Sequence, residues 1–182
     1  MTTPDRDQLA AAIHATSHIT GTFVLRSGMV SDEYFDKYRF EADPALLRDI
    51  AAALAPLVPD DTEALAGLEL GGVPIATMLS QVTGIPAYFV RKEAKAYGTA
   101  KLAEGADIDG KRCLVVEDVI TTGGQVVLST NDLRERGAIA EVVLCVIDRS
   151  GGDHAKLDGI GLELRSLLTM ADLDRAHAAS TA

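Results

Sequence analysis

Cysteine is scarce in this chain: of 182 residues only Cys113 and Cys145 are cysteines, and both lie in apolar, strand-like runs. Such a pair indicates two buried thiols in a reducing cytoplasm rather than a disulfide or a metal site. The four histidines lack ligand spacing, so we expect no metal site built from protein side chains. No apolar run reaches the ~18 residues that span a bilayer, and the start MTTPDRDQ lacks the apolar region of a signal peptide. These absences predict a cytoplasmic protein without a membrane segment.

Basic charge is also in deficit, with 17 lysines and arginines against 27 acidic residues and a formal charge of −10. A nucleic-acid-binding protein would need a basic face, so the composition argues against that class of partner. One segment departs from the rest: Arg91, Lys92, Lys95 and Lys101 stand close together against the single acid Glu93. A local positive region in an acidic chain can attract an anionic small molecule.

Apolar patterning predicts strands that alternate with helices, and no repeat or low-complexity linker interrupts them. The alternation indicates a single α/β domain over 1–182, with a parallel sheet flanked by helices. Two more strands around a turn near Gly28 predict a small N-terminal hood over about residues 1–40. From Arg175 onward the residues are small and polar enough to fray. The expected helices are Arg6–Ser17, Ala45–Leu57, Val73–Val82 and Gln125–Arg136; the expected strands are Ile19–Gly28, Ser31–Arg39, Ala64–Leu70, Ala87–Val90, Cys113–Val116, Val142–Ile147 and Leu162–Leu167.

The segment from Arg112 to Gln125 carries the clearest chemistry. Its apolar run is followed by Glu117 and Asp118, where we expect the strand to end, and then by the loop Thr121-Thr122-Gly123-Gly124 before a helix. Glycines let backbone N–H groups approach a ligand, and a helix N-terminus adds partial positive charge, so this loop can hold a phosphate monoester. Carboxylates beside it make sense as acceptors for sugar hydroxyls. The segment therefore predicts a ribose 5-phosphate site, although a solvent-facing turn without a ligand is the alternative reading.

A long polar stretch separates the strand ending at Val90 from the one starting at Cys113. Loops beyond about 12–15 residues are usually functional or disordered. Its lysines and its glycines at 98, 105 and 110 are typical of a hinged lid, and a merely solvated hairpin is the alternative.

Five segments of the chain resemble known sequences. Val115 to Gly124 (VVEDVITTGG) is similar to the phosphoribosyl pyrophosphate (PRPP) motif of type I phosphoribosyltransferases. Arg91 to Gly105 (RKEAKAYGTAKLAEG) resembles the mobile catalytic loop of the orotate phosphoribosyltransferase family, and Phe23 to Gly28 (FVLRSG) its early F-x-L-K-S-G segment. Tyr34-Phe35 and Asp148-Arg149 fall where that family has an aromatic pair and a D-R pair. On these segments the chain resembles the orotate phosphoribosyltransferases.

The resemblance implies a type I phosphoribosyltransferase fold and a reaction between PRPP and N1 of orotate. The products are orotidine 5′-monophosphate and pyrophosphate, in pyrimidine biosynthesis. It further implies Mg²⁺ held mainly by PRPP and a homodimer in which residues of a mobile loop, about 92–110, serve the neighbouring site. The implied catalytic residues are Lys95, Glu117 and Asp118; the implied PRPP-binding residues are Arg91, Lys92, Lys95, Tyr97, Glu117, Asp118, Val119, Ile120, Thr121, Thr122, Gly123, Gly124 and Gln125; the implied orotate-binding residues are Arg26, Tyr34, Phe35, Thr121 and Arg149.

The chain departs from the family pattern at two positions. Many members carry a lysine that contacts PRPP where this chain has Gly71, and Arg26 replaces a usual lysine. Two other readings remain. An adenine phosphoribosyltransferase would share the PRPP motif but lack the loop and F-x-L-R-S-G segments. A non-catalytic PRPP sensor would need an added DNA-binding module, for which no basic region is present.

Overall fold

The fold centres on a six-stranded sheet with the strand order β5-β4-β3-β6-β7-β8. The structure, a computed structural model, describes residues 5–25, 28–92 and 102–180. Neighbouring strands are parallel except for β5, which pairs antiparallel with β4. The expected parallel sheet is thus confirmed, and one short edge strand is added to it. The strands are β3 (Ala64–Leu68), β4 (Ala87–Val90), β5 (Ala103–Glu104), β6 (Cys113–Ile120), β7 (Val142–Asp148) and β8 (Glu163–Thr169).

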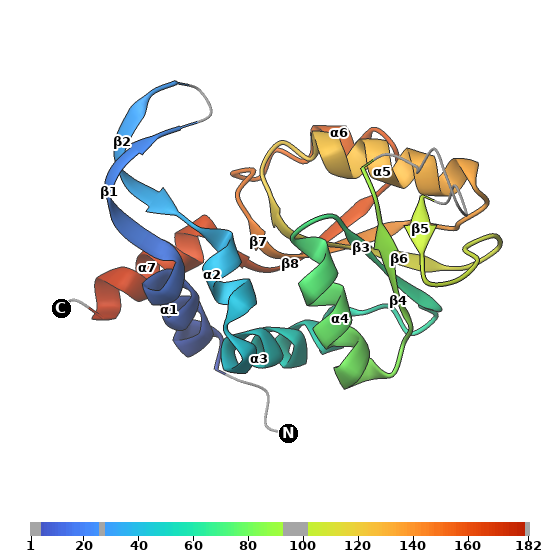
Figure 1. Cartoon of the computed structure of the whole chain (residues 1–182), viewed down its shortest axis with the longest axis horizontal. Coiled ribbons are helices and arrows are strands. Elements are labelled where there is room, and N and C mark those ends of the chain that lie inside the picture. Colours follow the sequence, from blue (N-terminus) through green and yellow to red (C-terminus); the bar gives the residue numbers. More distant parts are fainter. Residues whose placement is uncertain (1–4, 26–27, 93–101, 181–182) are drawn as a thin grey trace.

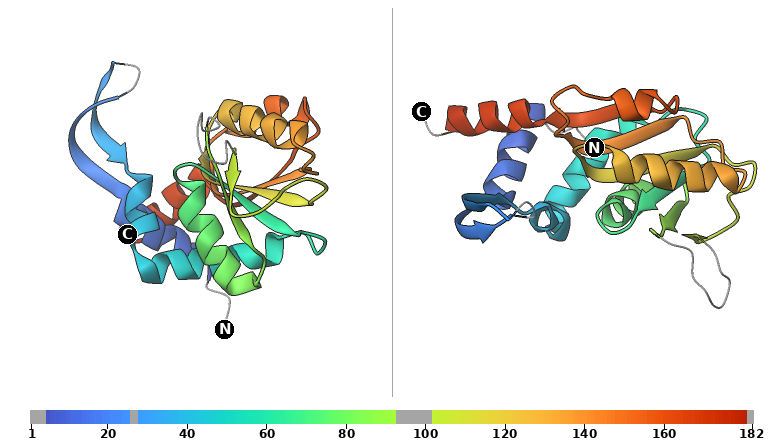
Figure 2. Two further views of the ribbon diagram at one scale, coloured as in Figure 1. Left: turned by 45° about the vertical axis from the view of Figure 1, so that its right-hand side comes forward. Right: turned by 90° about the horizontal axis from the view of Figure 1, so that it is seen from above.

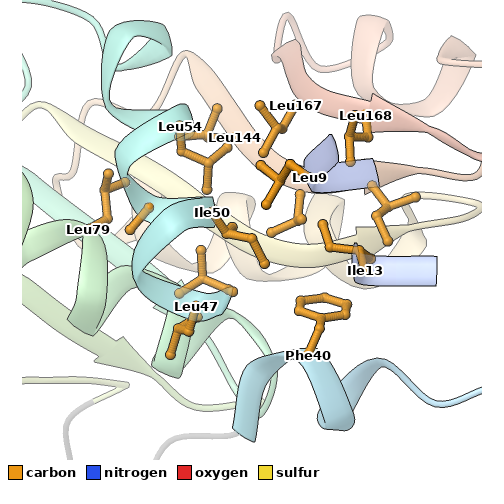
Figure 3. Close-up of a cluster of buried hydrophobic side chains, with 14 of the residues drawn as sticks. Leu9, Ile13, Phe40, Leu47, Ile50, Leu54, Leu79, Leu144, Leu167 and Leu168 are labelled. Atoms are coloured by element: carbon orange, nitrogen blue, oxygen red, sulfur yellow. The ribbon is translucent and has the colours of Figure 1, made fainter. Parts of the chain in front are cut away.

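Helices cover both faces of this sheet (Figure 1). Apolar residues succeed one another along β6 because alternate side chains enter two different cores. Leu114 and Val116 join the core on the side of α3 and α4, whereas Cys113 and Val115 join the core on the side of α5. Figure 3 shows the first of these cores, in which Ile50, Leu79 and Leu144 meet. The flanking helices are α3 (Pro44–Leu54, continued by the 3₁₀ turn η1, Ala55–Leu57), α4 (Gly72–Thr83), α5 (Gly124–Glu135) and the short α6 (Ala155–Asp158).

The N-terminal part adds a helix and a hairpin to the large sheet, and the helix packs into the same core. Helix α1 (Arg6–Ser17) leads into an antiparallel hairpin of β1 (His18–Val24) and β2 (Val30–Phe35), which confirms the expected hood strands. Figures 1 and 2 show this hairpin standing away from the large sheet. Helix α7 (Met170–Ser180) packs against α1, so the two ends of the described chain lie together. The hood is therefore built from both ends of the sequence.

Three expected boundaries were wrong. The second hood strand ends at Phe35 rather than Arg39, because Asp36 caps a helix, α2 (Lys37–Ala42), by accepting a hydrogen bond from the Tyr38 N–H. Strand β6 does not end before its acids but continues through them to Ile120. Residues 175–180 were expected to fray but belong to α7, whose Leu173 and Ala176 are buried in the core; residues 181–182 lie outside the described residues.

No helix in the described ranges is long and apolar enough to cross a bilayer.

Candidate active site

A hollow lies where β6 turns into α5. The turn is possible because Gly123 adopts a left-handed conformation (φ 67°) and serves as N-cap without any side-chain cap. The first N–H groups of α5 therefore point into the hollow without a side-chain partner, which is the usual arrangement for an anion site. Its volume is about 310 Å³. It is lined by Glu117, Val119, Ile120, Thr121, Thr122, Gly123, Gly124, Gln125 and Val126.

The two acids of the motif point in different directions, because consecutive side chains of a strand alternate between the faces of the sheet. Glu117 lines the hollow, whereas Asp118 is fully buried and does not line it. Burial, reinforced by a hydrogen bond and the charge of Asp118, raises the pKa of Glu117 to about 9. The structure thus brings together eight of the predicted PRPP-binding residues and places Asp118 beneath them.

Asp118 belongs to a cluster that the sequence did not reveal. Lys37 of α2 places its Nζ 2.6 Å from Oδ2 of Asp118, and Glu41, one turn further along α2, lies beside the same carboxylate. Burial raises the pKa of Asp118, but its polar contacts with Glu117 and Glu41 and the charge of Lys37 outweigh burial and lower the pKa overall. The pKa of Glu41 rises to about 9, mainly through burial and then through Asp118. We call Lys37, Glu41, Glu117 and Asp118 the acid–lysine cluster.

A signal for this cluster was present in the sequence. Residues four apart on a helix share one face, so Lys37 and Glu41 become neighbours once Asp36 is recognised as an N-cap. Reading Tyr34, Asp36 and Tyr38 as strand alternation hid that helix.

A second hollow, of about 470 Å³, lies between α1, the hairpin and α7 and reaches Arg149, which follows β7. Tyr34 and Phe35 line it together with Arg149, whose guanidinium carbon lies 5.7 Å from the centre of the Phe35 ring. Arg149 follows β7, and its N–H donates to the Ile120 carbonyl at 2.7 Å. Three orotate-binding residues predicted from the resemblance therefore meet at one place, with histidines 14, 18 and 177 further along the same wall.

Arg149 also borders the phosphate side of the site. Together with Thr121 and Thr122 it lines a smaller hollow of about 230 Å³. A planar guanidinium suits this position, since it can stack on an aromatic ring and donate to a carboxylate or carbonyl pair. The arrangement can hold a flat anionic ring beside a phosphorylated sugar.

The remaining candidates are placed less directly. Arg91 pairs with Glu104 of β5 at 3.3 Å, and the Lys92 N–H donates to Glu69 at 2.7 Å, so both extend from the end of β4. Neither lines the hollows described above. Arg26, Lys95 and Tyr97, together with the rest of residues 93–101 of the expected lid, lie outside the described residues.

Comparisons with known proteins agree with this geometry. Residues 38–160 match the family model described as phosphoribosyl transferase domain, which defines the class of protein. An orotate phosphoribosyltransferase from a Nocardioides species is 57% identical over 171 residues, covering 94% of this chain and 96% of the relative. The chain therefore belongs to the orotate phosphoribosyltransferase family.

Solved structures place the fold in the same family. Orotate phosphoribosyltransferase of Mycobacterium tuberculosis in complex with Fe(III) dicitrate has a TM-score of 0.84 and 36% identity, covering 93% of this chain and 99% of that chain. The same enzyme in complex with PRPP has a TM-score of 0.79 and 32% identity, covering 94% of this chain and 99% of that chain. The expected type I phosphoribosyltransferase fold is confirmed.

Proposed function

We propose that this chain transfers the 5-phosphoribosyl group of PRPP to N1 of orotate, releasing pyrophosphate and forming orotidine 5′-monophosphate in pyrimidine biosynthesis. The observation that carries the assignment is the position of Arg149. It lines the hollow of Tyr34 and Phe35 on one side and the hollow of Thr121 and Thr122 on the other. The guanidinium of Arg149 can thus contact the base at the point where the base hollow borders the site of the phosphorylated sugar. The relative whose structure holds PRPP supports the donor.

Each part of the site has a task in this reaction. The loop of Thr121, Thr122 and Gly123 and the first N–H groups of α5 hold the 5-phosphate. Glu117 faces the same hollow and binds the ribose hydroxyls; with a pKa near 9 it can donate as well as accept a hydrogen bond. Arg149 and Phe35 orient orotate so that N1 faces C1 of the ribose. Bond breaking builds positive charge on the sugar and negative charge on pyrophosphate, so positioning and leaving-group stabilisation matter most.

The departing pyrophosphate needs further cations besides Arg149 and Lys156, which line the smaller hollow of Thr121 and Thr122. We assign this role to Lys92 and Lys95, following the family loop, with Arg91 and Tyr97 as further PRPP contacts. Within the described ranges no group of three acidic, histidine or cysteine side chains could hold a metal ion. Mg²⁺ characteristically binds substrate phosphates through few protein ligands, and it would neutralise part of the charge on pyrophosphate. We propose that PRPP itself brings this ion to the site.

The working unit is proposed to be a homodimer in which the loop of one copy, including Lys95, serves the site of the other. Residues 1–182 act as one domain in this scheme, because the base hollow draws on both the hairpin and the large sheet. The two buried free cysteines suit a reducing cytoplasm. No nucleic acid takes part.

The assignment is tested by following the loss of the ultraviolet absorbance of orotate with PRPP and Mg²⁺. Parallel reactions offer adenine, hypoxanthine and uracil, and a Lys95→Ala variant serves as the loop control. We expect consumption of orotate alone, strongly reduced in the variant. Consumption of adenine instead would favour a purine enzyme and remove the role given to Arg149. PRPP binding without reaction of any base would favour a sensor.

A further inference from the structure

The position of Gly71 leaves no room for a side chain. A Cβ atom added to Gly71 would overlap Oδ2 of Asp118 and lie 2.9 Å from Oδ1. Asp118 has no exposed surface, so its carboxylate occupies the space beside Gly71 that the base of a side chain would need. Any cation at this corner of the site must therefore come from another element.

Lys37 supplies such a cation from α2. Its Nζ contacts the same Oδ2 atom of Asp118 at 2.6 Å and lies 5.3 Å from the centre of the Tyr38 ring. About one third of the lysine side chain remains exposed, while Asp118 is completely enclosed. The ammonium is therefore held at the boundary between the cluster and solvent.

We propose that Lys37 is a positioning residue for PRPP binding: it fixes the carboxylate of Asp118 between α2 and Gly71. Asp118 follows Glu117 directly, and its own N–H donates to Oε1 of Glu117 at 3.0 Å. Holding Asp118 in place thus fixes the direction of Glu117 into the phosphate hollow. The inference rests on the proposed function only for the identity of the ligand.

The charges around Asp118 explain why a cation is needed. Glu41 faces it from α2, Glu117 from its own strand, and Cys145 lies opposite Glu117 on β7. Among the described residues, Oε1 of Glu41 and Oδ2 of Asp118 itself are buried without a hydrogen-bond partner, so the ion pair with Lys37 is what compensates the charge at Oδ2. Without Lys37, Asp118 would be a buried charge among acidic groups and would take up a proton more readily.

The test compares Lys37→Met and Lys37→Arg with the wild type. Lys111→Met is a matched control, because Lys111 forms an exposed pair with Glu63 at 3.1 Å. For Lys37→Met we expect KM for PRPP to rise about tenfold or more and the acid limb of kcat/KM to move up by about one pH unit. KM for orotate should change less than about twofold. Lys37→Arg should keep KM for PRPP and the pH profile close to those of the wild type. Lys111→Met should behave as the wild type.

Equilibrium titration with PRPP alone keeps this test independent of the base. If the wild type transfers no ribosyl group to orotate, the proposed function is wrong. The effect of the Lys37 substitutions on PRPP affinity can still be measured in that case. Should Lys37→Met not fold, Lys37→Gln retains an amide donor without the charge and is measured instead. Unchanged PRPP affinity and an unchanged pH profile in a folded charge-removing variant would overturn the inference. Equal losses for PRPP and orotate without a pH shift would also overturn it, since they indicate general damage.

Discussion

The backbone of Gly71 lies against the carboxylate of Asp118, so closely that a Cβ atom at position 71 would overlap Oδ2. Because Asp118 is fully buried, it has no open space into which to retreat. We predict that Gly71→Ala lowers the free energy of unfolding by about 1–3 kcal/mol, the usual cost of overpacking. PRPP affinity should fall as well, because a displaced Asp118 redirects Glu117. Urea unfolding and PRPP titration measure the two effects.

The control for this substitution is Gly124→Ala at the start of α5. Its added Cβ would meet only Oγ1 of Thr122, at 3.9 Å, so we expect the stability of the wild type. Gly71→Lys, which adds a longer side chain at the same position, should be at least as damaging as Gly71→Ala. A Gly71→Ala protein as stable as the wild type would mean that Asp118 can move, contrary to its enclosure.

The phosphate hollow could be predicted from the sequence because its parts are contiguous. An apolar strand, acids, a hydroxyl- and glycine-rich loop and a helix follow one another within residues 112–125, and local rules suffice to connect them. The end of β6 could not be placed in this way. Two acids in succession suggested that the strand ends there. Their burial within β6 is stabilised by Lys37 and Glu41, which come from a distant part of the chain.

Helix α2 and the end of α7 were missed for two different reasons. Tyr34, Asp36 and Tyr38 alternate as in a strand, and this pattern competed with the capping signal of Asp36. The last helix is rich in alanine and charge, and its order comes from tertiary contacts with α1 that no local pattern encodes. Strand β5, with two residues, is too short to give any periodic signal.

Asp172 joins the two ends of the chain. Its carboxylate accepts hydrogen bonds from the N–H and hydroxyl of Thr169 and pairs with Arg6 of α1 and Arg175 of α7. Burial raises its pKa, but these partners outweigh burial and lower the pKa from 3.8 to about 2. The resulting stabilisation is complete above pH 3.8 and is lost as the pH falls through about 2.

We therefore predict that Asp172→Asn is less stable than the wild type by about 1–2 kcal/mol at pH 7, a value reduced by the exposure of both arginines. The difference should shrink as the pH falls below 4 and vanish near the lowered pKa of about 2. Urea unfolding of both proteins across this range provides the measurement. Glu163→Gln, which removes an exposed partner of Arg165, should cost little at any pH. If the difference in the free energy of unfolding does not vary with pH, the side chain of Asp172 stabilises the protein through packing and neutral hydrogen bonds rather than through its charge.

The guanidinium carbon of Arg149 lies 5.7 Å from the centre of the Phe35 ring. Arg149 lines both the hollow of Tyr34 and Phe35 and the smaller hollow of Thr121 and Thr122. Lysine at this position keeps the charge but loses the planar fork that can stack on the ring and donate two hydrogen bonds to one anion. We expect Arg149→Lys to raise KM for orotate by about 10- to 100-fold, the size of one charge-assisted hydrogen bond, with KM for PRPP changed about twofold or less. Arg165→Lys, on the exposed pair with Glu163, should leave both values unchanged. Steady-state kinetics with each substrate varied in turn separate the two constants. If KM for PRPP rises instead, Arg149 serves the phosphate side, and the base must be recognised by other residues.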